Sequence, residues 1–283
     1  MLPFTNVNAL IIDMDGVLWH GNQPIGGLNN FFETLRTIQI PFILATNNAS
    51  LTPQQYIEKF SKMGVEVYKN EILTSAMATV HFLSKQYTPE TTRVFVIGEP
   101  GIQEPLLEKG FTLTGLYEIN DRTGTNSKTG PHIVVCGLDR EISWDKLATA
   151  TLNINAGTAF IGTNGDTSLP TEIGETQGNG AILAALTAAT GITPTIIGKP
   201  EPIIYQQAMA ILKSKPEETI AIGDRLDTDI LGAVRSNIRS LMVLTGVSDQ
   251  KDATKSPFQP TWIMDNITSI TLALKNAHQS TTP

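Results

Sequence analysis

The sequence predicts an α/β fold in which a parallel sheet is covered by helices, with a second, smaller α/β domain inserted into the first. Short apolar runs that end in Gly, Asn or Asp alternate with segments of helical length, which is typical of strand-helix units. A chain of 283 residues lies at the size where one hydrophobic core stops growing, so two unequal domains are expected. The middle of the chain also forms a strand-rich block of its own.

The predicted elements follow this alternation from the N-terminus onward. Apolar runs predict strands at residues 8–13, 40–46, 93–98, 132–138, 159–164, 193–198, 219–224 and 239–244. Helical patterns lie between them at residues 27–38, 52–64, 74–86, 143–155, 178–190, 201–213 and 228–238. The helix at 52–64 has a clear start signal, because Thr52 is a capping residue and Pro53 suits the first helical position.

The inserted domain is predicted to span residues 89–192. Residues 1–88 and 193–283 then form the core domain together. Two segments interrupt the inserted block, a polar loop at 118–130 and a loop rich in Gly and Thr at 165–180.

Composition excludes several classes of protein. A formal charge of -7 and a pI near 5.1 argue against nucleic acid or anionic lipid as a partner. No run approaches the roughly 18–20 apolar residues of a membrane span, so a cytoplasmic protein is expected. Cys136 is the single cysteine, which excludes an intrachain disulfide and fits a reducing compartment. Its place after "PHIVV" predicts a buried strand residue.

Polar residues cluster at the predicted carboxyl ends of the core strands. Ligands bind at this edge of an open α/β sheet, so these residues are the candidates for a site. They are Asp13, Asp15, Thr46, Asn47, Asn48, Lys199, Asp224 and Asp229.

Asp13 and Asp15 form a carboxylate pair that needs a cation. Residues two apart on an extended chain point to the same side. Two carboxylates about 4 Å apart repel by roughly 4 kcal/mol at an effective dielectric near 20. Asp224 and Asp229 add further negative charge. A hard divalent cation bound through oxygen atoms, here Mg²⁺, resolves this repulsion.

The same edge suits a phosphate group. Lys199 offers a fixed positive charge and Thr46 a hydroxyl, and backbone N–H groups near Asn47 and Asn48 complete a cradle. Asp13 is the obvious nucleophile, because carboxylates form aspartyl-phosphate intermediates. Asp15 then fits the role of general acid and base, and Gly16 lets the chain turn away from the pair.

Four motifs in order resemble a known family. "DMDGVLW", "ATNN", "GKPEP" and "GDRLDTDI" are similar to the motifs of the haloacid-dehalogenase (HAD) phosphatases, specifically the NagD-like, p-nitrophenyl-phosphatase branch. The resemblance also covers "TNGDTSLPT" and "GNGAILAALTAATG". It implies a doubly wound, Rossmann-like core with an α/β cap between the second and third motifs, and a homodimer through the caps.

The resemblance also implies roles for individual residues. Asp13 is the nucleophile, Asp15 the general acid and base, and Thr46, Asn47 and Lys199 hold the phosphoryl group. Mg²⁺ is held by the Asp13 side chain, the Asp15 backbone carbonyl and Asp224, with Asp229 near its outer shell.

Residues of the cap are less constrained. Asn164 and Asp166 are candidates for substrate contact or for turn formation, and Asn48 for substrate contact or helix capping. Vitamin-B6 phosphatases of this branch carry a histidine in the substrate loop, where Leu169 stands here, which disfavours pyridoxal phosphate. Trp19 is expected to pack under the site.

The sequence therefore predicts a Mg²⁺-dependent phosphomonoester hydrolase that acts on a small phosphorylated metabolite such as a sugar phosphate, phosphoglycolate or a nucleotide. Two alternatives stay open. A phosphotransferase or mutase would use the same aspartyl-phosphate but deliver it to another hydroxyl. A non-catalytic phosphate-binding or signalling protein would share part of the acidic cluster.

Overall fold

A computed structural model describes residues 4–120, 130–171 and 174–281. The chain divides into two compact units. The core unit comprises Met1–Thr46, Gln54–Leu73 and Lys199–Pro283, and the cap unit comprises Asn47–Pro53 and Thr74–Gly198. The domain boundaries at 88/89 and 192/193 stay a prediction. Most of the polar loop predicted at 118–130 lies outside the described residues.

The core unit is built on a six-stranded sheet. Its strand order is β15-β14-β13-β1-β4-β5, and the strand pairs from β15 to β4 are parallel. The bounds are β1 Ala9–Ile12, β4 Phe42–Thr46, β5 Ile72–Thr74, β13 Thr219–Gly223, β14 Arg239–Val243 and β15 Trp262–Met264. The central strands β1, β4 and β13 are buried along their whole length, because helices cover a parallel sheet on both faces.

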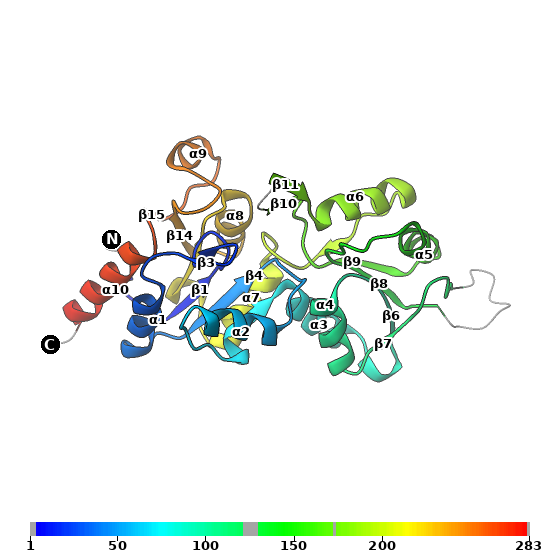
Figure 1. Cartoon of the computed structure of the whole chain (residues 1–283), viewed down its shortest axis with the longest axis horizontal. Helices are drawn as coiled ribbons and strands as arrows, with labels where there is room; N and C mark the ends of the chain where they lie inside the picture. The colour runs from blue at the N-terminus through cyan, green and yellow to red at the C-terminus, as the bar shows by residue number, and fades with distance from the viewer. Residues whose placement is uncertain (1–3, 121–129, 172–173, 282–283) are drawn as a thin grey trace. The chain divides into compact units, whose positions relative to one another are not determined.

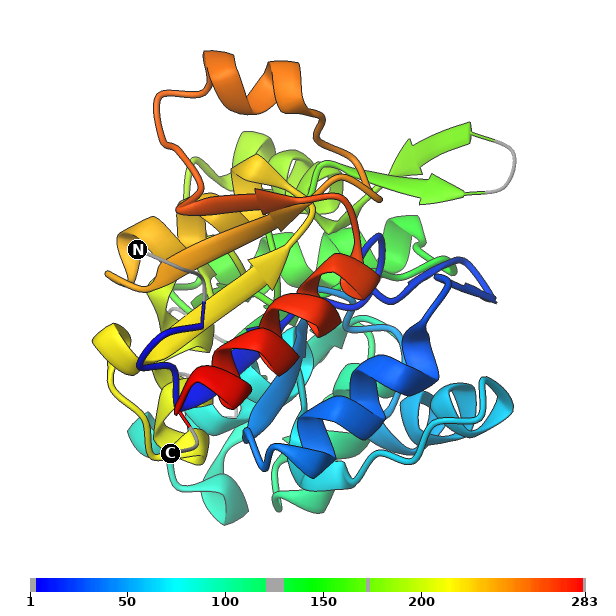
Figure 2. The same cartoon turned by 90° about the vertical axis from the view of Figure 1, so that its left-hand side faces the viewer.

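Helices of the core unit pack around this sheet. Their bounds are α1 Leu28–Thr37, α2 Pro53–Lys62, α7 Pro202–Leu212, the π-helical turn η4 Leu226–Ile230, α8 Leu231–Arg235, α9 Gln250–Lys255 and α10 Ile267–Thr281. Figure 2 shows α1 and α10 side by side across one face of the sheet. The two-residue strands β2 Trp19–His20 and β3 Gln23–Pro24 form a short hairpin after β1.

The cap unit contains a five-stranded parallel sheet of its own. The order is β12-β9-β8-β6-β7, with bounds β6 Arg93–Ile97, β7 Thr112–Leu113, β8 Ile133–Cys136, β9 Ala159–Gly162 and β12 Thr195–Ile196. Its helices are α3 Ser75–Gln86, α4 Pro100–Glu108, α5 Trp144–Asn155 and α6 Asn179–Thr190. In Figure 1, α5 and α6 cover one face, and their apolar residues form a core with Phe95, Phe160 and the buried Cys136.

Two of the predicted segments differ in the structure, and several short elements and the helices α4, α9 and α10 were not predicted. The loop predicted at 165–180 contains two short strands, β10 Ser168–Thr171 and β11 Gly174–Gln177, which pair with each other in antiparallel fashion. The helix predicted at 228–238 begins earlier, as the π-helical turn η4, because Asp229 and Ile230 both bond back to the carbonyl of Arg225.

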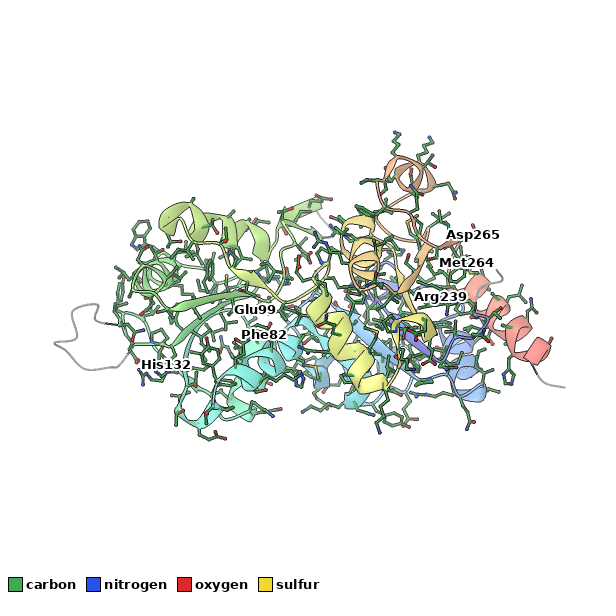
Figure 3. The ribbon with its side chains drawn as sticks, turned by 180° about the vertical axis from the view of Figure 1, so that it is seen from behind. Phe82, Glu99, His132, Arg239, Met264 and Asp265 are labelled. Carbon is green, nitrogen blue, oxygen red and sulfur yellow. The ribbon has the colours of Figure 1, made fainter. Side chains whose placement is uncertain are left out.

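Single side chains fix the ends of the two sheets (Figure 3). In the core unit, the Arg239 guanidinium donates to the carbonyls of Thr5, Asn6 and Glu217. In the cap unit, Nδ1 of His132 accepts from the backbone N–H of Arg93 at 3.0 Å. Among the described residues, no helix has the length and apolar content needed to cross a bilayer.

Candidate active site

Three neighbouring strands of the core sheet carry the candidate residues. Asp13 follows β1, Thr46 ends β4, and Asp224 follows β13. These strands are adjacent and parallel in the order β13-β1-β4, so their carboxyl ends meet at one edge. The residues at these three strand ends therefore lie at the same edge of the sheet.

Three carboxylates lie together at this edge. Each of Asp13, Asp224 and Asp229 offers an oxygen atom, and these atoms lie within 4.8 Å of one another. The three residues are only 8%, 2% and 3% exposed. Buried carboxylates this close repel strongly unless positive charge is present. The cluster is thus a site that is able to hold a metal ion.

Lys199 supplies part of that positive charge. Its ammonium donates to Oδ1 of Asp13 at 2.5 Å and to Oδ1 of Asp229 at 2.6 Å, and the side chain is 4% exposed. Burial alone would lower the pKa of Lys199, but the charges of Asp13 and Asp229 raise it well above its ordinary value. Burial raises the pKa of Asp13, and Lys199 opposes that rise.

Asp224 is the carboxylate whose surroundings fit a cation best. Its Oδ2 accepts the backbone N–H of Val247 at 2.7 Å, whereas its buried Oδ1 has no hydrogen-bond partner among the described residues. Burial, followed by the charge of Asp229, raises the pKa of Asp224 to about 7. A Cβ on Gly16 would come within 2.5 Å of Oδ2, and one on Gly246 would also clash with the carboxylate. Glycines therefore allow the loops to close tightly around it.

Asp15 differs from these three residues because it is exposed. Its Oδ1 accepts a hydrogen bond from the indole Nε1 of Trp19 at 2.7 Å. Gly16, at φ +80°, turns the chain between them, and its N–H donates to the Trp19 carbonyl at 2.8 Å. Trp19 packs in the core as predicted, and in addition it contacts Asp15 directly.

Sequence reasoning missed two buried tyrosines at the site. The Tyr205 hydroxyl donates to the Asp229 carbonyl at 3.0 Å, which fixes η4 to α7. Burial, and then the charge of Asp15, raises the pKa of Tyr56 well above its usual range. Both tyrosines stand at helical positions whose pattern indicates core packing, so no local signal distinguishes them.

The remaining candidates form a second group within the cap unit. Nδ2 of Asn47 donates to both carboxylate oxygens of Asp166, at 3.0 and 3.2 Å. Nδ2 of Asn164 donates to the Asn47 carbonyl at 2.8 Å. Oδ1 of Asn48 accepts from the N–H and the hydroxyl of Ser50, at 2.9 and 2.7 Å, which is a turn-forming role. The segment after β4 is thus bound to the loop after β9.

A parallel sheet with a buried carboxylate cluster at its carboxyl edge defines an α/β protein with a site that is able to hold a metal ion. The chain belongs to the haloacid dehalogenase-like hydrolases: the family's profile matches residues 10–112, and a second HAD-hydrolase-like profile matches residues 196–270. The prediction of this family is therefore confirmed, as is that of its α/β fold.

Named relatives cover nearly the whole chain. The 5'-nucleotidase YutF of Bacillus subtilis is 35% identical over 258 residues, which is 91% of this chain and 95% of that protein. An acid sugar phosphatase of Staphylococcus epidermidis is 37% identical over 256 residues, 90% of this chain and 93% of that protein.

Solved structures give the same result. NagD from Escherichia coli K-12 is 32% identical with a TM-score of 0.82, covering 92% of this chain and 97% of that one. A 4-nitrophenylphosphatase from Thermotoga maritima is 28% identical with a TM-score of 0.85, covering 95% and 98%. A calcium complex of a Mycobacterium tuberculosis glycerol phosphate phosphatase is 34% identical with a TM-score of 0.82, covering 93% and 74%. The prediction of the NagD-like branch and of a phosphatase of this family is confirmed.

Proposed function

We propose that the chain is a Mg²⁺-dependent phosphomonoester hydrolase that works through an aspartyl-phosphate on Asp13. The observation that supports this most directly is the buried cluster of Asp13, Asp224 and Asp229, in which Asp13 and Asp229 accept hydrogen bonds from the Lys199 ammonium. A nucleophilic carboxylate, a fixed ammonium and spare carboxylate oxygens are the groups that phosphoryl transfer requires.

The residues act in two steps. A carboxylate oxygen of Asp13 attacks phosphorus while the bond to the leaving oxygen breaks, and Asp15 donates a proton to that oxygen. Water then attacks the phosphorus of the aspartyl-phosphate, gives a proton to Asp15, and releases inorganic phosphate and Asp13. Throughout, Lys199 offsets the charge of the phosphoryl group, and Thr46 and Asn47 are assigned to hold it.

The donor set fits a hard divalent cation. All of the available ligands are carboxylate or carbonyl oxygens, and Asp224 Oδ1 is buried without a partner among the described residues. Asp13, the backbone carbonyl of Asp15 and Asp224 would hold the ion, with Asp229 in support. A bound Mg²⁺ supplies positive charge that offsets the repulsion between the substrate phosphate and these carboxylates.

The proposed substrates are small phosphorylated metabolites. Relatives are named for sugar phosphates, nucleotides and glycerol phosphate, so these classes form the first panel. A homodimer through the cap unit and a cytoplasmic location stay predictions.

The test is phosphate release from p-nitrophenyl phosphate and from this panel, with Mg²⁺ or with EDTA, for wild type and Asp13→Asn. We expect Mg²⁺-dependent release that falls by a factor on the order of 10³ or more in Asp13→Asn, because the amide is not nucleophilic. Asp227→Asn is the matched control: its carboxylate is exposed and paired with Arg225, so the same chemical change should leave turnover near wild type.

Two results would count against the proposal. Substantial turnover in Asp13→Asn would show that Asp13 is not the nucleophile. Phosphate release that EDTA does not affect would show that the reaction needs no metal ion. Phosphate transfer to added glycerol in place of water would instead favour the phosphotransferase alternative.

A further inference from the structure

Trp19 lies where it can control the proposed acid and base. Its Nε1 is 2.7 Å from Oδ1 of Asp15. Asp15 is the exposed member of the carboxylate pair, so water competes for its oxygens and its side chain needs a partner to hold one orientation. This inference rests on the proposed function, in which Asp15 transfers the proton.

The indole itself is held rigidly. Trp19 is 0% exposed, and Phe60 of α2 packs edge-on against its ring at a centroid distance of 4.8 Å. The Lys59 ammonium lies over the ring at 4.2 Å from its centroid. A cation over the ring face attracts the π-electrons, which makes the indole N–H a stronger donor.

The backbone turn does not depend on the indole bond. The Gly16 N–H donates to the Trp19 carbonyl, and the Leu18 N–H donates to the Met14 carbonyl, both at 2.8 Å. The Thr245 hydroxyl donates to the Gly16 carbonyl at 2.6 Å. The turn from Asp13 to Trp19 is therefore fixed by hydrogen bonds to its main-chain atoms, and the indole N–H acts on the Asp15 side chain alone.

We propose that Trp19 is a positioning residue that selects which oxygen of Asp15 carries the proton. An indole N–H is a donor only, so it bonds to Oδ1 whether Asp15 is ionised or protonated. The proton is then carried on Oδ2, the oxygen that the indole leaves available for the leaving group. In the first step the Oδ2–H bond breaks as the leaving oxygen takes the proton and its bond to phosphorus breaks. Asp15 becomes the carboxylate that later takes a proton from water.

This role predicts a dependence on the leaving group. An alkoxide leaves only with a proton, whereas p-nitrophenolate leaves without one. Poor orientation of Asp15 therefore slows the first step with alkyl phosphates more than with p-nitrophenyl phosphate. The ratio kcat/KM reports the steps up to departure of the leaving group, so it isolates this effect from hydrolysis of the intermediate.

The experiment compares kcat/KM of Trp19→Phe and wild type, with Mg²⁺, on glycerol 3-phosphate and on p-nitrophenyl phosphate. General acid catalysis contributes on the order of 10²–10⁴-fold, so partial loss of orientation is expected to lower kcat/KM for the alkyl phosphate by about tenfold. The value for p-nitrophenyl phosphate should change by less than about threefold. Trp144→Phe is the control, since that tryptophan is 81% exposed on α5.

Asp15→Asn separates the two ideas. If Asp15→Asn shows no selective loss with glycerol 3-phosphate, the role of Asp15 in the proposed function is wrong. If Asp15→Asn does show this selective loss, but Trp19→Phe lowers kcat/KM equally for both substrates or for neither, the inference about Trp19 is wrong. In the Asp15→Asn background, Trp19→Phe should add no further selectivity. Should Trp19→Phe fail to fold, benzothienylalanine at position 19 removes the N–H while keeping the shape, and the same criteria apply.

Discussion

Asp224 shows how a single carboxylate links the site to the stability of the fold. Its pKa is raised to about 7 by burial and by Asp229, while an unfolded aspartate titrates near 3.9. Between these two values the folded state binds more protons than the unfolded state. Stability of the metal-free protein therefore falls as pH rises through this window.

A cation should reverse this loss, and more strongly at high pH. At pH 5 Mg²⁺ has to displace the proton of Asp224, whereas at pH 8 the carboxylate is ionised and repelled by Asp229. We expect Mg²⁺ to raise the Tm clearly at pH 8 and little at pH 5. At 100 times Kd the stabilisation is about 2.7 kcal/mol. Thermal unfolding with Mg²⁺ or EDTA at both pH values measures it.

Asp224→Asn is the control for this prediction. The amide keeps an oxygen for the Val247 N–H but loses the charge, so its Tm should respond weakly to Mg²⁺ at either pH. Equal stabilisation of the wild type at pH 5 and pH 8 would contradict the proposed linkage between metal binding and the Asp224 carboxylate.

At the scale of the element, the segment after β4 is held by side chains of the cap unit. Asp166 accepts two hydrogen bonds from the Asn47 amide, and Asn164 binds the Asn47 carbonyl. The Ser75 hydroxyl at the start of α3 also donates to this carbonyl, at 2.6 Å. Asn47 therefore has little freedom, and its placement depends on residues more than 100 positions away.

Asp166→Ala is expected to remove the two hydrogen bonds that the Asn47 amide donates to this carboxylate. Hydrogen bonds to a charged group contribute about 1.5–3 kcal/mol, so the variant should be less stable by an amount in this range. If Asn47 holds the phosphoryl group, KM for p-nitrophenyl phosphate should rise several-fold with a smaller change in kcat. Steady-state kinetics and denaturant unfolding test both parts.

The matched control is Asp145→Ala, which removes an exposed carboxylate bonded to Tyr117 in the same unit. It should leave KM unchanged. If Asp166→Ala behaves like this control in both KM and stability, the hydrogen bonds between Asn47 and Asp166 do not contribute to substrate binding or to stability.

The buried strands and the strand-end residues were predictable from sequence for a physical reason. A strand such as β1 or β13 is buried on both faces, so its apolar run is continuous and the polar residue that follows marks its end. The short strands β7 and β15 carry no period and were not predicted. Helix α4 was missed because Pro100, Gly101 and Pro105 hide its pattern.

Side-chain partnerships at the site were not predictable in this way. The bond between Trp19 and Asp15 depends on the turn at Gly16, and that between Asn47 and Asp166 depends on how the segments of the cap unit fold together. Neither of these two contacts can be predicted from composition or from hydrophobic periodicity. The pairing of β10 with β11 is similar, because these short strands have no apolar alternation that would fix their register in advance.

At the scale of the whole molecule, each unit has its own sheet and its own apolar core. In the cap unit Phe160, 5% exposed, packs among residues of β6, β8, α5 and α6. In the core unit Phe32, 4% exposed, packs against Phe42 and Phe60. The carboxylates that bind the proposed metal all belong to the core unit. A multi-unit chain of this kind is not expected to unfold in one step.

Calorimetry should therefore resolve two transitions that respond to different changes. Phe160→Ala leaves a cavity in the cap unit. It should lower the free energy of unfolding of that unit by about 3–5 kcal/mol and leave the transition of the core unit unchanged. Phe32→Ala should lower the Tm of the core unit only, and Mg²⁺ should raise the Tm of that unit alone. Leu107→Ala, at a residue 54% exposed on α4, is the control and should move neither. A single transition that both phenylalanine variants and Mg²⁺ shift alike would mean that the two units unfold as one, because independent cores cannot share every perturbation.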